Sequence, residues 1–188
     1  MISEKYLTIL IPTLKKRGFY LERLMKCLNA QDQTHVEIIS CVNEGNVNIG
    51  KIRNMLIDQV KTPYLVFIDD DDLVAESYID DHMHMISMGV DVIGFKGLIY
   101  TDGKNPTEFV HQYGKEYATV RHGRYVTYER PIMHINVVKT EIAKKVRFPE
   151  KTFGEDRDYG IKLANSGLIS SAGFIDKTMY HYYYRTKK

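Results

Sequence analysis

Three short, continuous apolar runs, separated by segments of helical hydrophobic spacing, constrain this chain more than any other feature. The runs are Leu7 to Pro12, Val36 to Val42 and Tyr64 to Ile68, and the helical segments between them are Phe19 to Ala30 and Gly50 to Val60. Apolar runs without polar alternation are typical of strands buried on both faces. Strands that alternate with helices predict an α/β fold with a mostly parallel central sheet flanked by helices.

The rest of the chain continues this pattern less regularly. We expect helices at Ser77 to Met88, Thr140 to Lys145 and Glu155 to Asn165, and strands at Val90 to Phe95 and within Ile169 to Tyr184. The stretch from Gly97 to Arg130 is rich in Gly, Tyr, Thr and His, which favours a smaller antiparallel portion with loops. No linker or internal repeat divides the 188 residues, so we expect a single domain over residues 1–188.

Composition excludes several classes of protein. With 44% hydrophobic and 27% charged residues, the chain is neither disordered nor fibrous, and a net charge of +2 does not indicate a polyanion-binding protein. Cys27 and Cys41 lack the spacing of a zinc site or disulfide framework, which favours a reducing, cytoplasmic location. No run approaches the ~20 apolar residues of a membrane span, and the first run is followed by Lys15, Lys16 and Arg17, the reverse of a signal peptide's charge order.

Four consecutive aspartates, Asp69 to Asp72, follow the third apolar run without a break. This places them at the carboxyl edge of the predicted sheet, where α/β proteins bind ligands. Residues 69–81 hold seven acids and no Lys or Arg, so their charges repel one another unless a cation neutralises them. The cluster therefore favours a divalent metal, Mn²⁺ or Mg²⁺, with water and phosphate completing its shell.

A solvated or helix-capping turn explains the acid run alone equally well. An EF-hand-like loop is disfavoured, because Leu73 stands where an oxygen ligand is needed.

Five segments together resemble the family-2 glycosyltransferases, which are inverting enzymes with a GT-A fold, a Rossmann-like fold of nucleotide-diphospho-sugar transferases. The segments are LTILIPT at 7–13, VEIISCVNEG at 36–45, GKIRN at 50–54, YLVFIDDDDLV at 64–74 and FGEDRDYGIKLANSG at 153–167. They stand in the family's order and spacing and span most of the chain. The resemblance implies a metal-dependent enzyme that moves a sugar from a nucleotide-sugar donor to an acceptor hydroxyl.

The resemblance also assigns roles to individual residues. It implies nucleotide-sugar contacts at Pro12, Thr13, Asn43, Glu44, Arg53, Asp69, Asp70 and Arg185. Asp69 and Asp71 look like the family's DxD pair, with Asp69 near the ribose and Asp71 on the metal. His181 resembles the family's late histidine, which touches the metal or the diphosphate.

Glu155 and Asp156 resemble the family's ED motif, in which the aspartate is the general base that deprotonates the acceptor. Their separation in sequence from the aspartate cluster leaves one carboxylate free of the metal for this task. Read without the rest of the pattern, the two acids are ordinary first-turn residues of a helix.

The donor and the acceptor are less closely defined. The resemblance implies a UDP-sugar bound by residues of about 1–96, but Asn43 and Glu44 replace the aspartate that usually reads the base, which leaves the base open. The acceptor side is expected at about 97–188. Tyrosines interleaved with Lys and Arg at 96–150 would suit a glycan or a flipped, hydroxymethylated base in DNA. The plain structural alternative is a solvated antiparallel surface.

Two rival functions stay open. A metal-dependent nucleotidyltransferase shares this strand-and-carboxylate layout, but it normally has a Gly-rich, basic phosphate loop after the first strand. Here that segment is Thr13-Leu14-Lys15-Lys16-Arg17-Gly18, which is basic but not Gly-rich. The third possibility is a nucleotide-binding module without catalytic activity. The sequence does not predict the oligomeric state.

Overall fold

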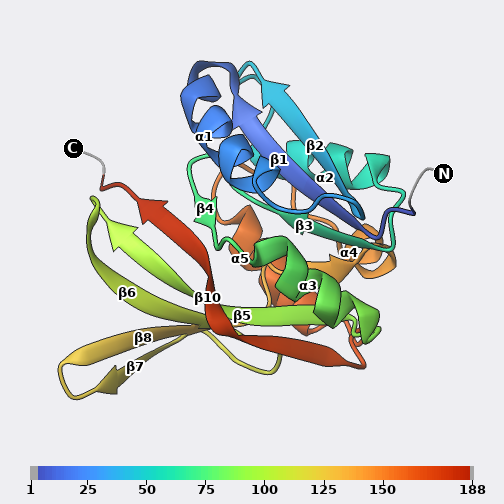
Figure 1. Ribbon diagram of the computed structural model, residues 1–188. Helices are drawn as coiled ribbons and strands as arrows, with labels where there is room; N and C mark the ends of the chain where they lie inside the picture. The colour runs from blue at the N-terminus through green and yellow to red at the C-terminus, as the bar shows by residue number, and fades with distance from the viewer. Residues whose placement is uncertain (1–3, 187–188) are drawn as a thin grey trace.

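The computed structural model describes residues 4–186, which fold around one mixed sheet (Figure 1). Its strands are β1 (Leu7–Leu14), β2 (Val36–Asn43), β3 (Tyr64–Phe67), β4 (Leu73–Val74), β5 (Val92–Thr101), β6 (Lys104–His111), β7 (Ala118–His122), β8 (Tyr125–Arg130), β9 (Val137–Lys139) and β10 (Ala172–Tyr184). Its helices are the 3-10 turn η1 (Lys15–Arg17) and α1 (Gly18–Asn29), α2 (Ile49–Gln59), α3 (Tyr78–Ser87), α4 (Thr140–Val146) and α5 (Glu155–Ala164).

The amino-terminal half is the α/β unit predicted from the apolar runs. β1 lies between β2 and β3 and is parallel to both, and all of its residues except Leu14 are buried. The sheet continues in the order β2-β1-β3-β9-β5-β6-β8-β7, and β10 pairs with β5 and β4. Because β1 and β3 are parallel neighbours, their carboxyl ends meet at one edge, and the aspartates follow β3 there.

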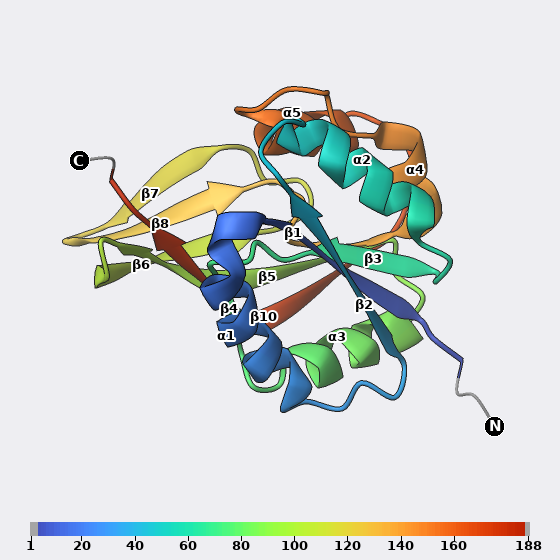
Figure 2. The ribbon, with the colours of Figure 1, turned by 90° about the horizontal axis from the view of Figure 1, so that it is seen from above.

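Two hydrophobic cores sandwich the sheet (Figure 2). Helices α1 and α3 cover one face, where Leu24 and Leu28 of α1 and Tyr78 of α3 are fully buried. Helices α2, α4 and α5 cover the other face, where Leu56 of α2 and Leu163 of α5 are fully buried. Apolar stripes at helical spacing therefore decide which side of each helix meets the sheet.

The second half of the chain is more continuous than its sequence indicates. The strand expected at Val90 to Phe95 extends to Thr101, and the strand or two expected within Ile169 to Tyr184 form the single long strand β10. β10 keeps its pairing with β5 through register shifts between Ile175 and Tyr180. β6, β7 and β8 form the expected strands of 97–130, although β6 and β8 pair in parallel. The short strands β4 and β9 have no clear sequence signal.

A glycine in α2 allows the loop before α5 to pack against that helix. A Cβ on Gly50 would lie 2.0 Å from the Pro149 carbonyl oxygen, and the Gly50 N–H donates to the Lys151 carbonyl at 3.3 Å. Only glycine permits so close a backbone approach. The loop that leads into α5 is thereby held against the start of α2. Among residues 4–186, none of the helices is both long and apolar enough to cross a membrane.

Candidate donor and acceptor cavities

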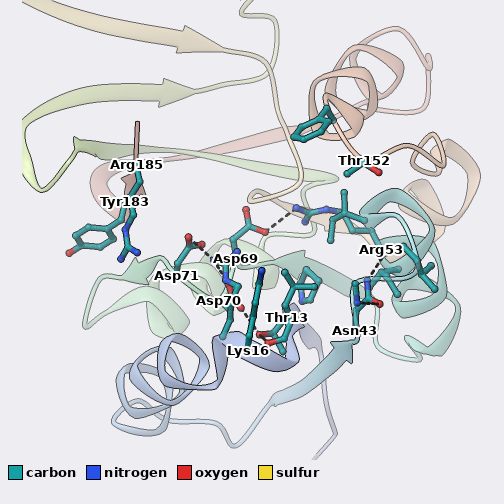
Figure 3. A pocket seen from close by; sticks show the side chains of 18 of the residues that line it. Thr13, Lys16, Asn43, Arg53, Asp69, Asp70, Asp71, Thr152, Tyr183 and Arg185 are labelled. Carbon is teal, nitrogen blue, oxygen red and sulfur yellow. Dashed lines mark hydrogen bonds and ion pairs between the residues drawn. The ribbon is translucent and has the colours of Figure 1, made fainter. Parts of the chain in front are cut away.

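A cavity of about 700 Å³ opens at the carboxyl edge of β1, β2 and β3 (Figure 3). We call it the donor cavity, because most of the residues predicted to contact the nucleotide-sugar line it. Eight of the residues predicted from the sequence line it: Pro12, Thr13, Asn43, Arg53, Asp69, Asp70, Asp71 and Arg185. They come from β1, the end of β2, helix α2, the aspartate turn and the end of β10, so segments from most of the chain converge there. Four cationic side chains, of Lys16, Arg17, Arg53 and Arg185, line the same cavity as the three aspartates.

Asp69 is held as an ionised carboxylate at the floor of this cavity. Its Oδ1 lies 2.9 Å from Arg53 Nη2, and its Oδ2 lies 3.3 Å from His134 Nε2. Burial by itself would raise the pKa of Asp69, but the charges of Arg53 and His134 lower it below its ordinary value. Arg53 is itself buried, with its Nε 3.6 Å from Glu155 Oε1, so it ties the aspartate turn to the start of α5.

Asp70 and Asp71 share one cation. Arg17 Nη2 lies 2.6 Å from Asp70 Oδ1 and 2.6 Å from Asp71 Oδ2. Asp70 is almost fully buried and also accepts a short hydrogen bond from the Thr13 hydroxyl. Burial raises the pKa of Asp70, against the opposing effects of Thr13 and Arg17. The Asp71 carboxylate is 30% exposed, which leaves it the more accessible of the two to a ligand.

Asp72 lies outside the donor cavity, lines a smaller cavity beside it, and is bound by β10. Its Oδ2 accepts a 2.8 Å hydrogen bond from the Tyr180 hydroxyl, and its Oδ1 accepts a 2.9 Å bond from the Tyr183 N–H. The same hydroxyl of Tyr180 accepts a 3.2 Å bond from the Asp69 N–H. Burial raises the pKa of Asp72 well above its ordinary value. Strand β10 therefore fixes the backbone of the aspartate turn.

A second, smaller cavity of about 270 Å³ adjoins the first, and Asp69 and Tyr182 line both. Asp156, the predicted general base, lies in this second cavity and not in the first. Its aromatic walls are Phe109, Tyr117, Tyr128, Tyr180 and Tyr182. Glu155, the other half of the motif, is buried against Arg53 instead, and its burial raises its pKa. The two acids are adjacent in sequence but lie in different surroundings.

Two predicted site residues lie elsewhere. Glu44 lies outside the donor cavity and pairs with Lys15 at 3.0 Å, on a shallow surface hollow beside the exposed end of β2. His181 lines neither cavity, and its Nδ1 lies 3.3 Å from the Tyr100 hydroxyl. Along β10 alternate residues face opposite sides, so Tyr180 and Tyr182 reach the second cavity and His181 does not. These contacts do not support His181 as a metal ligand.

Sequence reasoning missed Arg17, His134 and Tyr182. Arg17 belongs to a basic stretch whose role the pattern left open, and Tyr182 lies in a run of tyrosines that offers no distinction among its members. His134 lies in the loop before β9, far from any motif. Its backbone carbonyl accepts a 3.1 Å hydrogen bond from the Phe67 N–H, which holds this loop beside the end of β3, near Asp69. No sequence signal points to it.

The carboxylates around the donor cavity fit a divalent metal that takes much of its shell from phosphate and water. Within residues 4–186 no three acidic, histidine or cysteine side chains converge into a ready-made metal cage. One or two carboxylates are enough for Mg²⁺ or Mn²⁺ when substrate phosphates supply the remaining ligands. Arg17 bridges Asp70 and Asp71 with one positive charge.

Comparison with solved structures confirms the GT-A fold expected from the sequence. The 1–349 fragment of S. aureus TarS in complex with UDP-GlcNAc matches with a TM-score of 0.71 and 18% identity, over 97% of this chain and 60% of that one. The same fragment with UDP matches with a TM-score of 0.68 and 18% identity, over 95% of this chain and 60% of that one. The present chain thus spans about 60% of the length of those structures. Comparisons of the sequence with protein-family models and with curated proteins find no match.

Proposed function

We propose that this protein is an inverting glycosyltransferase, which moves a sugar from a nucleoside diphosphate sugar to an acceptor hydroxyl. The observation that carries the proposal is the division of the site into two cavities that meet at Asp69 and Tyr182. Most predicted donor residues gather in the larger cavity, and the predicted base stands in the smaller one. A reaction that joins two substrates requires adjacent places for both, so that the reacting atoms can be brought together.

The larger cavity suits a nucleoside diphosphate. Its carboxylates lie beside Lys16, Arg17, Arg53 and Arg185, so both a phosphate group and its counter-cation find partners of opposite charge. The cavity's end at Asn43 lies across from Arg185 and Tyr183 (Figure 3), which leaves an elongated space between them. The shared fold with a protein that was solved with UDP-GlcNAc supports a UDP-sugar as the donor.

Asn43 provides only part of a base-reading group. Its Nδ2 donates to the Val47 carbonyl at 2.7 Å, and its Oδ1 accepts from the Gly45 N–H at 3.0 Å, so the amide primarily shapes its own loop. An amide retains a further donor hydrogen and acceptor lone pair beyond these bonds. The proposed base contacts at this end therefore include the backbone of the loop as well as the side chain.

In the proposed reaction, Asp156 takes the proton from the acceptor hydroxyl. The acceptor oxygen then forms a bond to the anomeric carbon from the side opposite the leaving group, and the bond from that carbon to the diphosphate oxygen breaks. Arg17, Lys16 and Arg185 would stabilise the negative charge on the departing nucleoside diphosphate. Asp71 and Asp69 would hold a divalent metal, which supplies Lewis-acid stabilisation of that leaving group when bound.

The smaller cavity is the proposed acceptor site. Its aromatic walls and the guanidinium groups of Arg130 and Arg157, which lie over the Tyr117 ring at 5.2 and 5.4 Å, suit a flat apolar face with polar edges. The planar face of a sugar ring or of a nucleobase meets this description. A glycan and an exposed base in nucleic acid are therefore both acceptors to test.

Thermal denaturation with a panel of nucleoside diphosphates, each with Mn²⁺ or with a chelator, tests the proposal. A ligand at about a hundredfold excess over its Kd stabilises the folded state by ~2.7 kcal/mol. For a chain of this size that corresponds to roughly 5–10 °C in melting temperature. We expect UDP with Mn²⁺ to give such a shift and UMP to give a smaller one. The absence of a shift with every nucleotide would contradict the proposal.

A further inference from the structure

One guanidinium bridges two carboxylates of the aspartate turn. Arg17 Nη2 is equidistant, at 2.6 Å, from one oxygen of Asp70 and one oxygen of Asp71. The side chain of Asp70 is 3% exposed, and that of Arg17 is 30% exposed. Carboxylates of adjacent residues that share a cation at this distance would repel one another in its absence. Arg17 thus supplies a positive charge that offsets the repulsion between these carboxylates.

Charge rather than directed hydrogen bonding holds this arginine in place. The Nε and Nη2 atoms of Arg17 are buried, yet neither has a hydrogen-bond partner with good geometry among the described residues. Its guanidinium also lies 5.6 Å from the centre of the Tyr20 ring, which Arg185 approaches at 4.8 Å. Buried donors without aligned acceptors are costly, so phosphate oxygens in the donor cavity would be better partners for Arg17 than its present ones.

The backbone around Arg17 allows the side chain to change partners. Arg17 ends η1, a single 3-10 turn between β1 and α1 in which no residue is buried. The carboxylates, by contrast, lie on a turn that β10 fixes through Tyr180 and Tyr183. A swing of the Arg17 side chain between the carboxylates and the cavity therefore requires no movement of the sheet.

We propose that Arg17 is an internal counter-cation, which holds Asp70 and Asp71 while the cavity is empty and moves to the donor diphosphate when a divalent metal takes Asp71. Two cations cannot share the same carboxylate oxygens at these distances, because their mutual repulsion grows as they approach. Arg17 thus opposes binding of metal alone and favours binding of the diphosphate. This inference rests on the proposed function, since it concerns the donor of that reaction.

The test is the affinity for Mn²⁺ in the absence of nucleotide, measured by the paramagnetic resonance signal of free Mn²⁺. Arg17→Gln removes the competing charge, and we expect it to bind Mn²⁺ about tenfold more tightly than the unaltered protein, on the scale of pKa shifts caused by one adjacent charge. Arg147→Gln is the matched control, because Arg147 pairs with Asp58 on the surface and lines neither cavity. The control should bind Mn²⁺ as the unaltered protein does.

A second measurement uses UDP in the presence of a chelator. Arg17→Gln should bind metal-free UDP several-fold more weakly than the unaltered protein, because the diphosphate loses a cation. Arg17→Lys retains the charge without the planar fork and should fall between the two in both assays. If Arg17→Gln does not fold, the Mn²⁺ and UDP affinities of Arg17→Lys test the inference in its place.

Mn²⁺ affinity that is unchanged or weaker in the Arg17 variants would overturn the inference, and so would an absence of Mn²⁺ binding in every variant. The proposed function fails on a different result, namely that the unaltered protein binds no nucleoside diphosphate with or without metal. Tight UDP binding together with an unaltered Mn²⁺ affinity in Arg17→Gln would contradict the role of Arg17 as a counter-cation but not the proposed glycosyltransferase function.

Discussion

At the scale of single residues, four chemically identical aspartates are divided by their surroundings. Asp69 is ionised beside Arg53, Asp70 is buried under Arg17, Asp71 shares that arginine but stays 30% exposed, and Asp72 is buried against β10. A run of one residue type carries no such distinction in the sequence. Burial and the nearest partner of opposite charge decide which carboxylate can meet a ligand.

Substitutions of Asp71 and Asp156 should separate donor binding from transfer. We expect Asp71→Ala to lose the Mn²⁺-dependent part of the stabilisation by UDP, because it removes the accessible carboxylate of the donor cavity. Asp156→Asn should keep that stabilisation and lose roughly 10²- to 10⁴-fold in turnover, because it removes the proposed base in the other cavity. Thermal shift and the release of UDP from UDP-GlcNAc, with water as acceptor, measure the two effects. Equal loss of nucleotide binding in both variants would contradict this division.

At the scale of elements, β10 is the strand on which the site depends. It runs beside β5 from Ala172 to Tyr184, pairs with β4 immediately after the aspartates, and ends at the donor cavity with Arg185. Tyr180, fully buried on this strand, joins Asp69 and Asp72 through one hydroxyl. The aspartate turn is therefore held from the far end of the chain.

Removal of the Tyr180 hydroxyl should loosen this turn. Tyr180→Phe keeps the ring but leaves the Asp69 N–H and one Asp72 oxygen without their partner, at a cost of about 1–3 kcal/mol in the free energy of unfolding. UDP affinity should fall as well, since Asp69 lines the donor cavity. Urea denaturation and UDP titration provide the two measurements.

Tyr78→Phe is the matched control for this substitution. Tyr78 of α3 is also fully buried, but its hydroxyl has no hydrogen-bond partner among the described residues. Its removal should leave stability unchanged or slightly higher, with UDP affinity unaltered. A loss of stability and affinity as large as that of Tyr180→Phe would show that the hydroxyl bonds to the aspartate turn are not the cause.

At the scale of the whole molecule, buried histidines link stability to pH. His82 lies in the core between α3 and the sheet, against Tyr78 and Phe95, and burial lowers its pKa to about 4. An unfolded histidine has a pKa of about 6.5, so the unfolded chain takes up a proton first as the pH falls. The contribution of neutral His82 to the free energy of unfolding is therefore fully present above pH 6.5 and is lost as the pH falls toward 4.

This linkage predicts a difference between two denaturation series. Between pH 7.5 and pH 5, the protein should lose ~2 kcal/mol of unfolding free energy through His82 alone. His82→Gln should be less stable at pH 7.5 but should lose ~2 kcal/mol less over this range, because glutamine does not titrate. Urea unfolding of both proteins at the two pH values measures the difference. Parallel losses would show that His82 does not titrate as its burial predicts.

The expected elements and the order of the motifs were open to prediction because they depend on local chemistry. An apolar run such as Tyr64 to Ile68 favours a strand buried on both faces, and it places the aspartates at the sheet's carboxyl edge. The fold class followed from such patterns, whereas the resemblance to the family-2 glycosyltransferases supplied the eight predicted residues that line the donor cavity. Helical spacing determined which helix faces are buried in the same way.

Only the tertiary structure decided which partners those residues meet. Arg17, His134 and Tyr180 reach the aspartates through contacts between segments far apart in sequence, and the direction of a side chain on β10 separates Tyr182 from His181. Hydrophobic periodicity reports whether a side chain is buried but not what it is buried against. The charge on each carboxylate, and hence its chemistry, depends on which groups surround it, because electrostatic effects are set by distance and burial in three dimensions.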